Sequence, residues 1–148
     1  MYKRDKIILV FVMIAVGGLA YFFKLDYKFL SMGALTVVAV FMVVYTTSFS
    51  GLVGTNLAKK MKETQDKTMK DKTELGVLRA YYNYSFVFVI ITIVLSCICE
   101  VLNEYIDDIS KEMWYVIFSA VSYAFFLGNI CLAVIVNRFM MNRQLWDA

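Results

Sequence analysis

Histidine, the side chain most often used for acid–base chemistry near neutral pH, is absent from this 148-residue sequence. Its absence also excludes every zinc site that needs an imidazole ligand. No GxSxG motif, P-loop or pair of catalytic carboxylates occurs either. We therefore expect that the protein is not an enzyme and that it holds no cofactor or metal ion.

The three cysteines are the remaining reactive side chains. Cys97 and Cys99 are two residues apart and point about 200° apart around a helix, so they do not ligate one ion together. Cys131 lies in a different apolar run, near the opposite membrane face. We interpret all three as ordinary membrane cysteines.

Charged side chains are concentrated in one segment, residues 58–74, which holds ten of them within seventeen positions. Six lysines outnumber four acids, so the segment carries a net charge of +2. Six pairs of opposite charge are spaced four residues apart, from Lys59 with Glu63 to Lys70 with Glu74. Such pairs stabilise a helix by roughly 0.2 to 0.5 kcal/mol each, so the spacing predicts a solvated, charged helix or loop.

A bend is predicted just before this segment. Gly51 and Gly54 weaken a helix, and Thr55 or Asn56 can cap a new one. A bend of this kind is also a place where a gate can hinge.

The charged segment is the candidate gate of the molecule. Lys59, Lys60, Lys62 and Arg79 lie nearest the predicted membrane ends, where their field on a bound ligand is strongest. We expect them to bind an anionic cytoplasmic ligand such as a nucleic-acid oligomer, with lipid head groups as the alternative. The segment has no interleaved aromatic residues for base stacking.

Four long apolar runs account for most of the remaining chain, which is 61% hydrophobic and contains no proline. They cover about residues 7–23, 29–50, 80–100 and 113–137, and each suits the roughly 17 to 25 residues of a spanning helix. The sequence predicts a single all-α membrane domain over residues 1–148. Its four transmembrane helices form two hairpins, joined by a charged cytoplasmic connection over about residues 51–79.

The first run has one alternative interpretation, a cleaved signal sequence, because basic residues precede it. Its apolar core is longer than the roughly 7 to 15 residues typical of a signal. Bulky aromatic residues also stand where a small-residue cleavage site is needed. We expect this run to remain as the first helix.

Orientation follows from the distribution of lysine and arginine between short loops. If both termini are cytoplasmic, twelve of the fifteen basic residues lie inside and three lie outside. The outer connection before the last helix carries acids instead, among them Glu104, Asp107 and Asp108, which predict an acidic outer mouth. The protein is therefore expected in a bacterial inner membrane with both termini in the cytoplasm.

Asn129 lies well inside the last helix, and Ser122 lies on the same face seven residues earlier. This face either bonds a neighbouring helix or lines water. Four helices have little room for a wet pore, so conduction requires several subunits around an axis, and we expect a tetramer.

Two other functions are open. A small-molecule transporter is disfavoured because no charged residue falls at a helix centre, although Gly17 and Gly18 permit close packing around a substrate. A non-conducting membrane subunit and a phage holin-like pore are the further alternatives.

The layout of two apolar hairpins joined by a charged connection, with "TELGVLRAYYNYSF" leading into the third helix, resembles the small membrane effectors of bacterial anti-phage defence, in particular the Hailong type. The resemblance covers the general layout and no specific motif. It implies a membrane-depolarising channel in antiviral defence, held shut by a short nucleic-acid oligomer that a partner nucleotidyltransferase makes. We therefore predict a homo-oligomeric ion channel or pore-forming effector with a basic cytoplasmic mouth.

Overall fold

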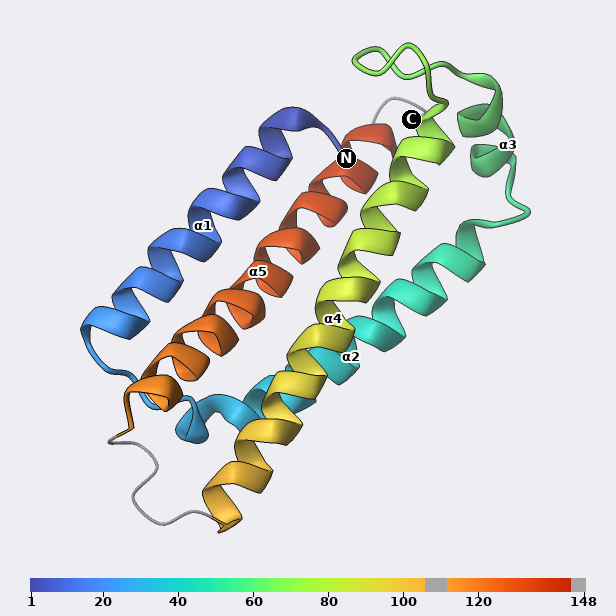
Figure 1. Ribbon diagram of the computed structural model, residues 1–148. Helices are drawn as coiled ribbons and strands as arrows, with labels where there is room; N and C mark the ends of the chain where they lie inside the picture. The colour runs from blue at the N-terminus through green and yellow to red at the C-terminus, as the bar shows by residue number, and fades with distance from the viewer. Residues whose placement is uncertain (106–111, 145–148) are drawn as a thin grey trace.

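The computed structural model of the protein describes residues 1–105 and 112–144 (Figure 1). These residues form five helices: α1 (Lys3–Phe22), α2 (Lys28–Leu52), α3 (Asn56–Glu63), α4 (Glu74–Tyr105) and α5 (Met113–Gln144). Within the described ranges there is no β-strand, only an isolated bridge between Gln65 and Thr73. The predicted all-α class is confirmed.

Four of the helices, α1, α2, α4 and α5, are long and apolar enough to cross a membrane. The chain is thus a multi-pass membrane protein, as predicted. Each helix is longer than its predicted range of 7–23, 29–50, 80–100 or 113–137, although α1 ends one residue earlier, at Phe22. A charge-free run marks only the part of a helix that lies in lipid. The largest difference is at α4, whose buried residues Val77, Leu78 and Tyr81 belong to a helix that already begins at Glu74.

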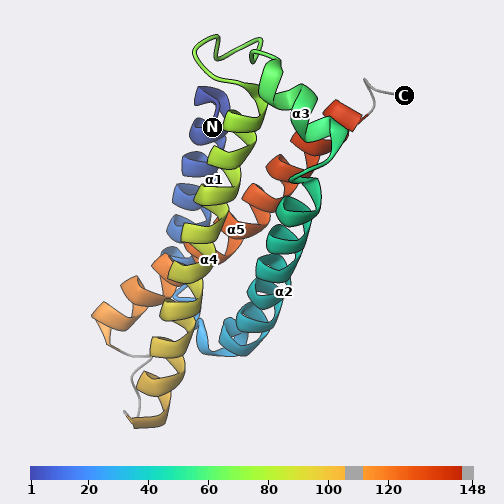
Figure 2. The same cartoon turned by 90° about the vertical axis from the view of Figure 1, so that its right-hand side faces the viewer.

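The central helix of the molecule is α5, which lies between α1 and α4 (Figure 1). Half of its most apolar stretch, 50%, is buried, against 11% for α1. The prediction that consecutive helices pair as hairpins is not confirmed for α1 and α2. These two diverge from their short connection (Figure 2), and α1 packs mainly against α5 while α2 packs mainly against α4.

The predicted bend after the second helix is present between Leu52 and Thr55. Gly54 has a φ of 96°, a left-handed conformation that L side chains rarely adopt. Thr55 then caps α3, because its hydroxyl accepts a hydrogen bond from the Ala58 N–H at 3.2 Å. α2 and α3 are therefore separate helices.

The charged segment is only partly helical. α3 ends at Glu63, and the chain then folds back so that the Glu74 N–H donates to the Thr64 carbonyl at 3.1 Å. Of the six predicted charge pairs, only Lys59 with Glu63 lies wholly within α3. Of the two predicted alternatives, helix or loop, the segment is helical up to Glu63 and a loop over residues 64–73, because six weak pairs do not outweigh a loop that hydrogen-bonds its own backbone.

Candidate functional site

The N-terminus, α3 and the C-terminal end of α5 lie at one end of the molecule, which we call the basic end (Figure 1). The predicted gate residues gather here: Lys59, Lys60 and Lys62 are exposed on α3, and Arg79 is exposed in the second turn of α4. α3 packs against α4 and buries Ala58 and Met61 on its inner side. The lysines are thus presented to solvent by a helix whose apolar side is fixed.

Asp66 holds the loop that follows α3. It is 1% exposed, and its Oδ1 accepts hydrogen bonds from the backbone N–H groups of Thr68 at 2.9 Å and Met69 at 2.7 Å. The Tyr2 hydroxyl donates to its other oxygen, Oδ2. This carboxylate therefore shapes the loop and connects it to the N-terminus.

Tyr81 connects three helices at the basic end. Its hydroxyl donates to Asp5 of α1 and accepts a hydrogen bond from the Tyr2 N–H at 3.2 Å. Its ring lies 5.5 Å from that of Phe139 on α5, and the Tyr2 ring lies 6.0 Å away. The basic end of the molecule is consequently a packed unit rather than a set of free helix ends.

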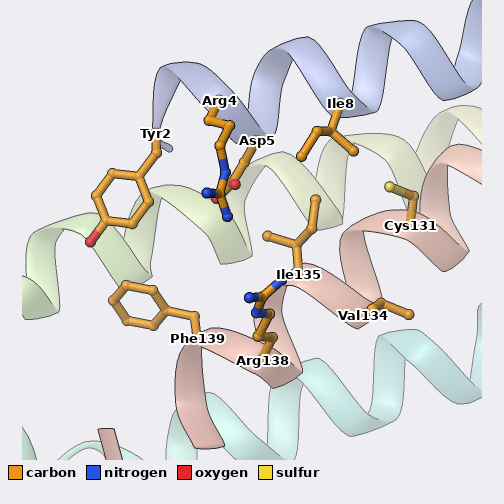
Figure 3. A pocket seen from close by; sticks show the side chains of 9 residues that line it. All are labelled: Tyr2, Arg4, Asp5, Ile8, Cys131, Val134, Ile135, Arg138 and Phe139. Atoms are coloured by element: carbon orange, nitrogen blue, oxygen red, sulfur yellow. The ribbon is translucent and has the colours of Figure 1, made fainter. Parts of the chain in front are cut away.

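A pocket of about 470 Å³ opens between α1 and α5, and Tyr2, Asp5 and Phe139 of this network form part of its wall (Figure 3). Arg4 and Arg138 reach into it from the two helices, and both are exposed. Aliphatic and aromatic side chains form most of the remaining wall. This pocket was not predicted from the sequence, because Arg4 and Arg138 are 134 positions apart in the chain.

Asn129 is fully buried where α5 meets α4. Its amide nitrogen donates to the Thr92 hydroxyl at 2.6 Å and to the Phe88 carbonyl at 3.1 Å. Ser122, also fully buried, donates to the Phe118 carbonyl of its own helix at 2.9 Å. Within the single chain, the predicted polar face is therefore in contact with protein.

The opposite end of the molecule contains one acid of the predicted outer mouth. Glu104 is exposed near the end of α4, whereas Asp107 and Asp108 lie outside the described residues. Asp26, which the sequence did not single out, accepts a hydrogen bond from the Tyr115 hydroxyl at 2.9 Å. Asn103 donates to the same hydroxyl at 2.9 Å, so α4, α5 and the first connection are joined here.

Tyr27 fixes the connection between α1 and α2 to α4. It is fully buried, and its hydroxyl shares a hydrogen bond of 2.9 Å with Ser96 on α4. Burial raises the pKa of Tyr27 to about 12. The phenol is thus held in its neutral form.

The outward face of α2 differs from every other spanning surface. In the described spans, all exposed serine and threonine residues belong to α2, and the serines and threonines of α4 and α5 are buried. The exposed members are Thr36, Thr46, Thr47, Ser48 and Ser50.

Three of these residues belong to a stripe of small residues that are alternately three and four positions apart in the sequence. We call Gly33, Thr36, Val40, Val43, Thr47 and Ser50 the α2 stripe. Every member is exposed, and at 100° per residue the stripe lies opposite the buried side of α2, where Val38 and Tyr45 pack. The stripe can be found from the spacing in the sequence, but the sequence does not show which side of α2 faces the rest of the chain.

No protein-family model, curated protein or solved structure matches this chain. The resemblance to Hailong-type effectors therefore stays a prediction from the layout of the sequence. The charge distribution and the exposed faces of the helices are the basis on which a function can be proposed.

Proposed function

We propose that the protein is a subunit of a homo-oligomeric ion channel in which α2 faces the central axis. The observation that carries this proposal is the confinement of exposed spanning serines and threonines to α2. A helix that faces only lipid gains nothing from hydroxyl groups, whereas a helix that lines water or packs on another helix does.

The contrast with α1 supports this choice of helix. The outward side of α1 carries Ile7, Phe11 and Ile14, with exposed fractions of about 70%, which suits contact with lipid chains. The α2 stripe has no side chain larger than valine, and small residues allow helices of different subunits to approach closely. Since the interior of one chain is packed around Asn129, the conducting path lies between subunits.

The charged ends give the channel a direction. The exposed Lys59, Lys60 and Lys62 make a basic inner mouth, and an oligomer of four subunits multiplies their field. We propose that this mouth binds an anionic cytoplasmic ligand, such as a nucleic-acid oligomer made by a partner nucleotidyltransferase. In this proposal the channel depolarises a bacterial inner membrane during antiviral defence.

Ion flux into liposomes, measured beside the mass of the reconstituted particle, tests conduction. We expect a multimer whose flux falls at least tenfold when Thr36→Leu and Thr47→Leu are combined, because leucine narrows and dries the path. The matched control is Val10→Leu on the lipid side of α1, where flux should stay unchanged. A conducting monomer, or equal flux in all three proteins, would contradict the proposal.

Ligand control is tested separately with Lys59→Gln, Lys60→Gln and Lys62→Gln in one chain. Short DNA oligomers should reduce the flux of the parent protein, and this response should weaken in the variant and in high salt. Lys28→Gln at the opposite end is the control. Equal responses of variant and parent would leave α3 without a role in gating.

One observation favours the alternative of a non-conducting membrane subunit. The hydroxyls of Thr36, Thr46 and Thr47 all donate to carbonyl groups of α2 itself, at 3.1, 2.7 and 2.8 Å. Threonines bonded in this way can pack against a dry helix as well as against water. A stable multimer without flux would identify this alternative.

A further inference from the structure

The pocket between α1 and α5 brings together two positive charges from distant parts of the sequence. Arg4 belongs to the first turn of α1, and Arg138 lies in the last two turns of α5. Figure 3 shows both side chains extending toward the same space between the helices. Neither guanidinium has an ion-pair partner in the part of the chain that the structure describes. Two such groups on separate helices can hold one phosphate from two sides.

The one acid among the described residues of the pocket wall, Asp5, has another partner. The Tyr81 hydroxyl of α4 donates a hydrogen bond to its Oδ2, so this oxygen is directed to α4. Asp5 still lowers the net charge of the lining residues to +1. A single negative headgroup is therefore a better match than a polyanion.

Beside the arginines, and farther along the two helices from the basic end, the wall is apolar. Ile8 of α1 and Val134 and Ile135 of α5 line the part of the pocket that leads toward the middle of the spanning helices. A ligand that fits the whole pocket needs an anionic head and a hydrocarbon tail. The phosphate of a soluble oligonucleotide has no group for this lower wall.

We infer that the pocket between α1 and α5 binds an anionic phospholipid, with its phosphate between Arg4 and Arg138 and its acyl chain against Ile8 and Val134. Basic pockets between spanning helices at a cytoplasmic membrane face are suited to such headgroups. The site is separate from the α2 stripe and from the lysines of α3, and it does not depend on whether the protein conducts.

Native mass spectrometry of the full-length protein, released from nanodiscs of phosphatidylglycerol and phosphatidylcholine, tests the site. We expect retained phosphatidylglycerol to exceed retained phosphatidylcholine. Arg4→Gln or Arg138→Gln should each weaken retention about fivefold, and the double variant at least tenfold, because each basic residue near a membrane contributes about 1 kcal/mol. Lys3→Gln is the matched control and should retain the lipid, because Lys3 is an exposed basic residue next to Arg4 that is not among the residues lining the pocket.

Two further variants make the outcome independent of folding. Arg4→Lys with Arg138→Lys keeps both charges and should restore most of the retention. Ile8→Trp fills the apolar wall and should reduce retention of the lipid while leaving the arginines in place. Three results would overturn the inference. They are equal retention of both lipids by the parent protein, an effect of Lys3→Gln equal to that of the pocket variants, and displacement of the lipid by a short oligonucleotide.

Discussion

Asn129 is a polar amide that hydrogen bonds hold inside an apolar helix bundle. Its amide nitrogen donates to the Thr92 hydroxyl and the Phe88 carbonyl on α4 and to the Phe125 carbonyl on its own helix, all within 3.2 Å. The Oδ1 oxygen is buried and has no hydrogen-bond partner among the described residues. The amide thus fixes the register of α5 on α4 through its nitrogen alone.

A double-mutant cycle of Asn129→Leu and Thr92→Val measures this contact. Hydrogen bonds between spanning helices couple by about 0.6 kcal/mol on average and by up to about 1.7 kcal/mol, and the short bond here should lie toward the upper value. Unfolding in mixed detergent micelles gives the free energies. Ser122→Ala with Thr92→Val is the control pair and should show no coupling, since among the described residues Ser122 bonds only its own helix.

Tyr27 gives the stability a dependence on alkaline pH. Its pKa is about 12 in the folded protein and 10 in an ordinary environment, so the folded state holds the phenolic proton more tightly. The resulting stabilisation is fully present below pH 10 and is lost as the pH rises through 12. Tyr27→Phe should therefore lose less stability than the parent protein between pH 10 and pH 12, measured by chemical unfolding. An identical pH profile would mean that Tyr27 titrates normally.

At the scale of the helices, the connection from α2 to α3 depends on one glycine. A Cβ at Gly54 meets no atom within 4 Å, so any cost of Gly54→Ala comes from the backbone φ of 96°. We expect this substitution to destabilise the protein by about 1 to 2 kcal/mol. Gly18→Ala in α1 also enters open space but needs only helical φ, and it should stabilise by about 0.5 to 1 kcal/mol. The same sign for both changes in thermal unfolding would contradict this explanation.

The helices themselves were predictable because lipid imposes long apolar runs, and the Gly54–Thr55 break was predictable from local backbone preferences. The start of α4 at Glu74 was not, because its first two turns are amphipathic and pack on protein rather than on lipid. The loop that Asp66 holds depends on Tyr2, a partner 64 residues away. For the same reason, neither the exposure of the α2 hydroxyls nor the Arg4–Arg138 pocket could be predicted, because both depend on which sides of the helices pack together.

On the scale of the whole molecule, the two ends differ in charge and each is connected by its own hydrogen bonds. Tyr2, Asp5 and Tyr81 connect the basic end, and Asp26, Asn103 and Tyr115 connect the other. The Tyr2 hydroxyl also bonds Asp66 in the loop after α3, so the N-terminus and this loop lie at the same end of the molecule, and we expect them on the same side of the membrane.

Cysteine labelling of intact cells assigns that side. In a protein without native cysteines, Asp107→Cys should react with an impermeant maleimide and Gln65→Cys should not, because basic ends stay in the cytoplasm. Tyr2→Cys should be protected together with Gln65→Cys. Labelling at Gln65 with protection at Asp107 would invert the proposed orientation.

The divergence of α1 and α2 bears on when the protein can finish folding. α1 packs mainly against α5, and α2 packs mainly against α4, so the helices synthesised first have partners that are synthesised later. At a synthesis rate of about 5 to 20 residues per second, the first half of the chain stays in the lipid for several seconds without its final neighbours. Assembly is therefore completed only when the last helix has been inserted. If the chain is divided within residues 64–73, the two half-chains should fold only when they are produced together.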